Sequence, residues 1–297
     1  MKIVFLGTTC MVPTKDRNHY SIYSEYDGQG LLFDCGEGTQ RQMKIAGIKP
    51  SKISKIFISH WHGDHVLGIP GLLQTMGANQ YEGKLQIFGP KGTKDKIMNM
   101  FKVFIFDNKI ELEVIDIEKD GKIIDTKDYL VESYKLEHSV ETFGYRFIEK
   151  DKINIDIIKA EKIGLKEGPI MGKLQRGEDI EFEGKKYKNS NLTKIKKGKI
   201  LGIISDTRFI SNCYKIAEDA DLLISEASYG DDKEDKAEEY FHLTSKQAAL
   251  IASNSNVKKL ILTHFSQRYT TTSELEEEAR TVFDNTVCAY DFMKTNL

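Results

Sequence analysis

The stretch Ser59-His60-Trp61-His62-Gly63-Asp64-His65 places four metal-binding side chains within six residues, directly after an apolar segment at 55–58. The composition of that segment predicts a buried strand. At its end, His60 and His62 are two residues apart and point to the same side, so both can hold one ion. Asp64 and His65 open the next segment, where a turn into a helix would carry them to the opposite wall of the same cleft. This spacing predicts two adjacent ions. A single structural zinc would need a closed tetrahedron and more often uses paired cysteines.

Other apolar segments end in the same manner. Those at 200–204, 222–224 and 260–262 are each followed by a hydroxyl residue and then a functional group, in the pairs Ser205-Asp206, Ser225-Glu226 and Thr263-His264. His138 follows the segment 129–136, which alternates as a half-buried strand does. Ligand sites of layered α/β folds collect at the carboxyl edge of the strands. A capped strand end or a buried core histidine would explain any one of these residues alone. Their recurrence beside a metal motif favours a shared site.

These residues carry a resemblance to the metallo-β-lactamase superfamily, whose motif His-x-His-x-Asp-His is matched by His60, His62, Asp64 and His65. Within that superfamily, four further stretches resemble the ribonuclease Z family of tRNA 3′-processing endonucleases: Pro13-Thr14-Lys15-Asp16-Arg17-Asn18, the segments 34–40 and 68–73, and His242-Leu243-Thr244-Ser245. The resemblance runs from Met1 to the end of the chain. Ser205 departs from the family pattern, in which Gly precedes the bridging Asp, but this change removes no ligand.

The resemblance implies the fold and its parts. It implies an α/β architecture, a four-layer αββα metallo-β-lactamase sandwich, formed by a single domain over residues 1–297. The chain order agrees, because the segments indicate a helix near 37–47, a strand and helix within 53–77, and a second α/β half from about 199 to 297. A last helix is expected near 273–280, with Thr272 or Ser273 as its N-cap. A flexible basic arm is expected as an insertion at 150–198.

The expected cofactor is two Zn²⁺ ions per chain. The ligands would be divided as follows: His60, His62 and His138 for one ion, Asp64, His65 and His264 for the other, and Asp206 as the bridge. Two such ions lower the pKa of a shared water, which then attacks the phosphate, and Asp64 would orient that water or accept its proton. Histidine at position 62 favours zinc, with manganese left open.

A proton donor is also needed for the leaving 3′-oxygen. By resemblance this general acid is His242, with Glu226 fixing its orientation. A capping or surface role beside Thr244 and Ser245 is the alternative for His242, and an ion pair with a lysine is the alternative for Glu226.

Charge is distributed unevenly along the chain. The formal net charge is −2, yet residues 150–199 carry 14 Lys and Arg against 8 Asp and Glu. A solvated lysine-rich insertion is the simple interpretation of such a run. The stretch 167–177 contains Gly168, Pro169 and further glycines, which predict an extended loop without a helix. It resembles the arm with which the ribonuclease Z family holds the body of tRNA, and Lys173 and Arg176 are its expected phosphate contacts. In the same family the 13–18 loop implies substrate contacts by Lys15, Arg17 and Asn18.

The composition of the chain indicates the size of its core and the cellular compartment in which it works. The hydrophobic fraction of 40% in 297 residues is enough for a large core. No segment approaches the roughly 18 apolar residues of a membrane span. The four cysteines, at 10, 35, 213 and 288, lack disulfide or zinc-pair spacing, which predicts a reducing cytoplasm and cysteines in the core. The expected partner is precursor tRNA, and the family implies a homodimer in which the arm of one subunit holds the tRNA that the other cuts.

Two other classes of function stay open at this level. A small-molecule metallo-hydrolase or cyclic-nucleotide phosphodiesterase of the same superfamily would share the metal motif, but would need neither the basic segment nor the 13–18 loop. A catalytically inactive RNA-binding module would need no complete ligand set. Metal analysis and an assay on precursor tRNA separate the three.

Overall fold

Two seven-stranded sheets make up most of this computed structural model, which describes residues 1–105 and 110–297. The first sheet has the order β18-β1-β2-β3-β4-β5-β6. Its strands are β1 (Lys2–Gly7), β2 (Ser21–Tyr26), β3 (Gln29–Phe33), β4 (Ile53–Phe57), β5 (Lys84–Pro90), β6 (Glu111–Ile117) and β18 (Lys294–Asn296). β3, β4, β5 and β6 run parallel, so the carboxyl ends of β3 and β4 lie at one edge.

The second sheet has the order β17-β16-β15-β14-β9-β8-β7. Its strands are β7 (Gly121–Asp125), β8 (Tyr129–Leu136), β9 (Thr142–Glu149), β14 (Ile200–Ile204), β15 (Leu222–Glu226), β16 (Leu260–Thr263) and β17 (Thr286–Cys288). The neighbours β14, β15, β16 and β17 are parallel, which brings the carboxyl ends of three functional segments to a common edge. The expected strands at 200–204, 222–224 and 260–262 are thus confirmed.

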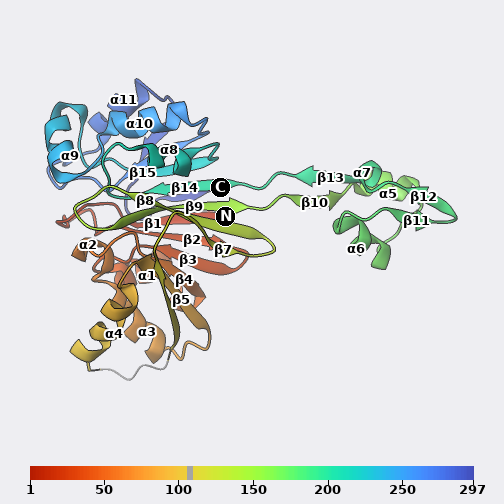
Figure 1. Cartoon of the computed structure of the whole chain (residues 1–297), viewed down its shortest axis with the longest axis horizontal. Coiled ribbons are helices and arrows are strands. Elements are labelled where there is room, and N and C mark those ends of the chain that lie inside the picture. Colours follow the sequence, from red (N-terminus) through yellow and green to blue (C-terminus); the bar gives the residue numbers. More distant parts are fainter. Residues whose placement is uncertain (106–109) are drawn as a thin grey trace. The chain divides into compact units, whose positions relative to one another are not determined.

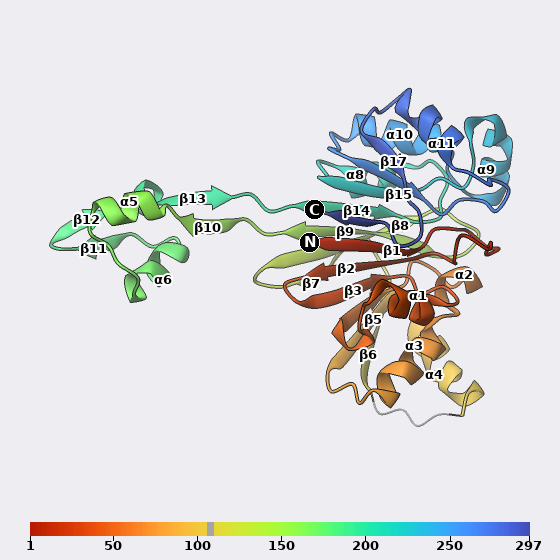
Figure 2. The same ribbon diagram turned by 180° about the vertical axis from the view of Figure 1, so that it is seen from behind.

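Helices cover the outer faces of both sheets (Figures 1 and 2). Beside the first sheet lie α1 (Thr39–Ala46), α2 (Gly63–Val66), α3 (Ile69–Ala78), α4 (Thr93–Val103) and the 3₁₀ turn η1 (Pro50–Lys52). Beside the second lie α8 (Ser211–Ala217), α9 (Glu234–Tyr240), α10 (Ser245–Asn254), α11 (Ser273–Arg280) and η2 (Asp231–Lys233). This layering confirms the αββα prediction. α11 begins where the sequence predicted, with Thr272 as its N-cap residue.

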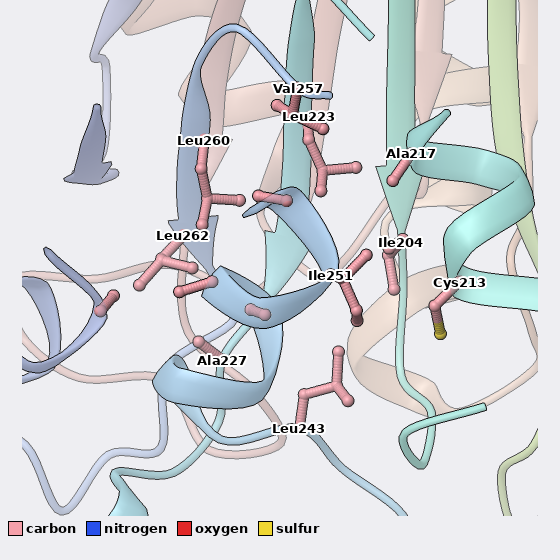
Figure 3. Close-up of a cluster of buried hydrophobic side chains, with 14 of the residues drawn as sticks. Ile204, Cys213, Ala217, Leu223, Ala227, Leu243, Ile251, Val257, Leu260 and Leu262 are labelled. Carbon is pink, nitrogen blue, oxygen red and sulfur yellow. The ribbon is translucent and has the colours of Figure 1, made fainter. Parts of the chain in front are cut away.

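Apolar faces of helices and sheet form the core of each half. In the second half, Leu223, Leu260 and Leu262 of the sheet belong to one buried cluster with Ile251 of α10 and Cys213 of α8 (Figure 3). α10 is held at its start by a capping box between Thr244 and Gln247, which satisfies backbone N–H groups that the first turn leaves free. The strand ends that carry functional groups therefore stand on a rigid base.

The chain forms two compact units. The larger consists of residues 1–123, 131–147 and 200–297, and the smaller of 124–130 and 148–199. The smaller unit contains the short pairs β10 (Lys152–Ile155) with β13 (Thr193–Lys196) and β11 (Ile180–Phe182) with β12 (Lys185–Tyr187), and the helices α5 (Ile157–Lys162), α6 (Pro169–Gln175) and α7 (Asn189–Leu192).

The prediction of an extended loop at 167–177 is wrong, because residues 169–175 form α6. Pro169 occupies the first turn, where its missing N–H costs nothing and its fixed φ favours a helix. Gly172 is tolerated inside the helix because Leu174 is fully buried in the small core of this unit, with Ile170 and Met171 packed against it. Burial of one apolar face of α6 outweighed the cost of about 1 kcal/mol that glycine adds to a helix.

The described residues, 1–105 and 110–297, contain no helix with the length and apolar character of a membrane span.

Candidate metal centre

The segment after β4 carries the histidine motif on a bend and a short helix. His60 is fully buried at the strand end, and His62 is the N-cap residue of α2, so Asp64 and His65 lie in its first turn. This is the strand-to-helix turn that the spacing predicted. The buried ends of β14, β15 and β16 bring Asp206, Glu226 and His264 to the same region.

A first group of four side chains converges on one point. The ligand atoms of His60, His62, His138 and Asp206 all lie within 4.8 Å of one another. His60 Nε2 is 3.0 Å from His62 Nδ1, which is 3.2 Å from His138 Nε2. Burial lowers the pKa of each of these three histidines, so the rings are neutral at physiological pH. Neutral imidazole nitrogens gathered around one point are what a zinc ion binds.

A second group contains Asp64, His65 and His264, again with ligand atoms within 4.8 Å. The Nε2 atoms of His65 and His264 are 3.1 Å apart, and Asp64 Oδ2 is 3.5 and 3.6 Å from them. Burial lowers the pKa of His65, but the surrounding carboxylates, Asp206 first, outweigh it and raise that pKa. The pocket thus attracts positive charge, which either a proton or a metal ion supplies.

Asp206 lies between the two groups. Its Oδ2 is 3.7 Å from His60 Nε2 and 3.6 Å from His65 Nε2, and its Oδ1 is 3.4 Å from His264 Nε2. One carboxylate therefore faces histidines of both groups. Asp64 Oδ1 is buried and has no hydrogen-bond partner among the described residues. An orphaned carboxylate oxygen is costly unless a ligand satisfies it, so the donor set fits a metal centre.

The other ring nitrogens of the histidines are occupied, which fixes the nitrogen that faces the centre. Nδ1 of His65 donates to Asp34 at 2.8 Å, and Nδ1 of His138 donates to the Phe241 carbonyl at 3.0 Å. The Ser228 hydroxyl lies 3.1 Å from Nδ1 of His264. Such outer partners orient ligands and raise their basicity.

His242 and Glu226 form an ion pair next to these groups. Nδ1 of His242 lies 3.1 Å from both carboxylate oxygens of Glu226. The Thr207 N–H and the Ser228 hydroxyl, each 2.8 Å away, hold that carboxylate in place. Burial lowers the pKa of His242, yet Glu226 outweighs burial and raises it to about 9. The ring is therefore a cation at neutral pH and can donate a proton.

A cleft of about 570 Å³ opens beside the two groups. Its lining includes His242 and four residues with groups that can meet a substrate: Tyr229, Lys236, Tyr240 and Arg268. Cys10 also lines it, although the sequence placed all four cysteines in the core. Burial, with help from Asp206, raises the pKa of the Cys10 thiol to about 12.

Comparison with known proteins gives the family. A family model described as Anti-Pycsar protein Apyc1 matches residues 1–147, a little under half of the chain. Ribonuclease Z of Bacillus cereus (strain B4264) is 43% identical over 302 residues, which cover 98% of this chain and 97% of that protein. The chain belongs to the ribonuclease Z family. Ribonuclease Z of Bacillus anthracis is 42% identical over the same share of the chain.

Solved structures agree with this membership. The short form of human tRNase Z has a TM-score of 0.75 at 27% identity, covering 100% of this chain and 99% of that one. A long-form RNase Z from yeast has a TM-score of 0.70 at 19% identity, covers 99% of this chain and 41% of that one, and shows the shared fold alone.

Two side chains of the loop at 13–18, which resembles the ribonuclease Z family, form hydrogen bonds to backbone carbonyls of neighbouring segments. The Lys15 side chain is 91% exposed and pairs with Asp16 at 3.5 Å. Arg17 instead donates to the carbonyls of Ser266 and Tyr269, and the Asn18 amide donates to the Glu37 carbonyl. Of the three expected substrate contacts, Lys15 alone presents a largely exposed side chain, while Arg17 and Asn18 shape the loop.

The expected contacts of the arm all lie in the smaller unit. Gly168 and Pro169 begin α6, Lys173 lies on it, and Arg176 follows it and pairs with Glu178 at 2.6 Å. Lys173 and Arg176 are both exposed.

Sequence reasoning assigned no role to several supporting residues. Asp34 lies in a stretch that resembled the family and could have been found there as a carboxylate following a strand. Ser228 and Arg268 gave no signal, because no local pattern shows that Ser228 reaches His264 or that Arg268 lies over the Tyr229 ring.

Proposed function

We propose that this protein is a metal-dependent endoribonuclease that removes the 3′ trailer from precursor tRNA. Membership of the ribonuclease Z family over nearly the full chain is the observation that carries this proposal. In the proposed reaction, water adds to the scissile phosphate, the bond from phosphorus to the 3′-oxygen breaks, and that oxygen leaves as the 3′-hydroxyl of the tRNA. The trailer keeps the phosphate.

The donor set supports two Zn²⁺ per chain. His60, His62 and His138 would hold one ion, Asp64, His65 and His264 the other, and Asp206 would bridge them; the distances described above support this division. When bound, the ions would supply a nucleophilic water at neutral pH and neutralise charge on the phosphate.

The protein's own groups would handle the protons. One Asp64 oxygen accepts a hydrogen bond from the Met11 N–H at 2.8 Å, and the other has no partner in the part of the chain that the structure describes, which suits it to orient the attacking water. His242 would protonate the leaving 3′-oxygen from Nε2, since Glu226 occupies Nδ1. An alkoxide leaving group is strongly basic, so this donation matters.

Substrate binding would use charge away from the centre. Lys15 of the 13–18 loop would meet a phosphate near the cut, with Arg17 and Asn18 shaping the loop. The segment 150–198 would act as a tRNA-binding arm, through Lys173, Arg176 and the start of α6 at Gly168 and Pro169. The working form would be a homodimer in the cytoplasm. Light scattering of the purified protein tests the dimer.

Cleavage of a precursor tRNA with a 3′ trailer tests the function. The expected products are tRNA ending in a 3′-hydroxyl and a trailer with a 5′-phosphate, and elemental analysis should find two zinc ions per chain. Cleavage of a cyclic nucleotide or small ester, with the precursor left intact, would replace the proposal by a small-molecule hydrolase.

A further inference from the structure

Arg208 connects three segments that each carry a functional group. It lies two residues after Asp206, and its backbone N–H donates to the Glu137 carbonyl at 2.9 Å, next to His138. Its guanidinium also pairs with the Glu137 carboxylate at 3.1 Å. On the other side, Nε and Nη2 donate to the Glu238 carbonyl at 3.2 and 3.1 Å, at the end of the helix that leads to His242.

The same guanidinium covers Phe241, the residue before His242. Its carbon lies 3.8 Å from the centre of the Phe241 ring, a cation–π contact. Phe241 has φ 60° and ψ 52°, the left-handed region that a bulky L-residue rarely adopts. Such a conformation persists only where neighbours hold it, and it often marks a functional position.

This conformation of Phe241 has two uses. Its carbonyl accepts a hydrogen bond from His138 Nδ1 at 3.0 Å, and it turns the chain so that His242 reaches Glu226. The His242 N–H bonds to the Ala237 carbonyl at 2.8 Å, so the turn has little freedom. Loss of the guanidinium would let the turn relax and move the His242 ring.

We infer that Arg208 is a positioning residue for the proton donor: by clamping Phe241 and Glu238 it holds His242 where it can protonate the leaving 3′-oxygen. This inference rests on the proposed function, because it assumes that His242 is the general acid. Arg208 lies 28% exposed behind the turn and, unlike Arg268, is not part of the cleft lining. Its effect should therefore appear in the protonation step and not in tRNA binding.

The test compares leaving groups. Arg208→Ala should lower kcat on precursor tRNA by about 10- to 10²-fold, the usual cost of misplacing a reacting group by about 1 Å, with KM little changed. Hydrolysis of a p-nitrophenyl phosphodiester, whose leaving group needs no proton, should fall far less. Arg280→Ala is the matched control, since Arg280 is also partly exposed and binds a backbone carbonyl and a glutamate. It should leave both reactions unchanged.

A double-mutant cycle separates positioning from general support of the fold. In a His242→Ala background, Arg208→Ala should cause no further loss, because the group that it positions is gone. Phe241→Leu, which removes the ring but keeps an apolar side chain, should reproduce the leaving-group dependence if Arg208→Ala fails to fold. Equal losses on both substrates, a change confined to KM, or additive losses in the double variant would overturn the inference. Wild-type protein that leaves precursor tRNA intact would instead overturn the proposed function.

Discussion

The larger and smaller units use polar residues in opposite ways. In the larger unit, His60, His65 and Asp206 are at most 3% exposed. The second ring nitrogen of each of these two histidines has a hydrogen-bond partner, and Asp206 lies between the two ligand groups. In the smaller unit the buried core consists of five apolar residues, Ala160, Leu165, Leu174, Ile180 and Leu192, and most of the charges face solvent.

Under the proposed function, this difference would serve two tasks. Chemistry at a phosphate needs groups held in place before the substrate arrives, in surroundings where electrostatic forces are strong. Attraction of a polyanion needs accessible charge and tolerates movement. On this proposal the chain would place a buried reaction centre in one unit and exposed charge in the other, and variants that affect one task while sparing the other test that separation.

The largest effect is expected from Asp206→Ala. Loss of Asp206 removes a carboxylate that lies within 4 Å of histidines in both clusters, so metal content and both activities, on precursor tRNA and on a p-nitrophenyl phosphodiester, should fall to background. Elemental analysis and the two assays measure this. Asp231→Ala, which breaks a surface pair with Lys246, should keep full metal and activity. Retention of two zinc ions by Asp206→Ala would contradict the bridging role.

His242→Ala should separate metal binding from proton donation. Turnover of precursor tRNA should fall by about 10² to 10⁴, the usual contribution of a positioned acid, while zinc content stays unchanged. Single-turnover kinetics and elemental analysis measure the two quantities. A variant as fast as wild type would remove His242 from the mechanism.

Deletion of residues 159–188 should affect binding alone. If the removed cations neutralise phosphates as proposed, tRNA affinity should fall by roughly tenfold or more, and the slope of log affinity against log salt should become shallower by about 0.7 to 0.9 per lost contact. Ester hydrolysis and zinc content should persist. Equal affinity and equal slope with and without the segment would reduce it to a solvated insertion.

Glu226→Gln should change the pH dependence within the larger unit. His242 must carry a proton to act, and Glu226 raises its pKa to about 9, so wild-type turnover should decline only as pH rises through about 9. Without the carboxylate the pKa falls and the decline should begin at lower pH. A pH profile of kcat measures the shift; identical alkaline limbs in the two proteins would mean that another group sets that limb.

The smallest effect on activity is expected from Leu174→Ala in the smaller unit. Removing a buried leucine lowers the free energy of unfolding by about 2–5 kcal/mol. A core of five residues is too small to stay folded after such a loss, so amides of α5 and α6 should lose protection in hydrogen exchange. Those of β14 to β16 should not change. Leu223→Ala is the counterpart in the larger unit and should lower its melting temperature. Coupled loss of protection in both units would show that they are not separate in stability.

The structure brings the seven residues that the sequence proposed as ligands into two groups, because their placement follows from local rules. Two residues at a strand end share a side, and parallel strands bring their carboxyl ends together, so His60, His62, Asp206 and His264 could be grouped before the fold was known. Arg208 and Ser228 could not be found in this way, since their partners are set by side-chain directions across distant segments. The helix at 169–175 was not predicted because glycine and proline usually interrupt helices. Here the burial of Leu174 stabilises the helix by more than Gly172 destabilises it.

The two histidine clusters draw on both halves of the chain. His60, His62, Asp64 and His65 follow a strand of the first sheet, whereas His138, Asp206 and His264 follow strands of the second. An ion bound by both sets acts as a cross-link that forms only after the two sheets have met, so its binding free energy adds to the cohesion of the finished fold. Newly made chains in a cell short of zinc should therefore be more exposed to proteolysis, and the abundance of the protein should follow the supply of the metal as well as the rate of its synthesis.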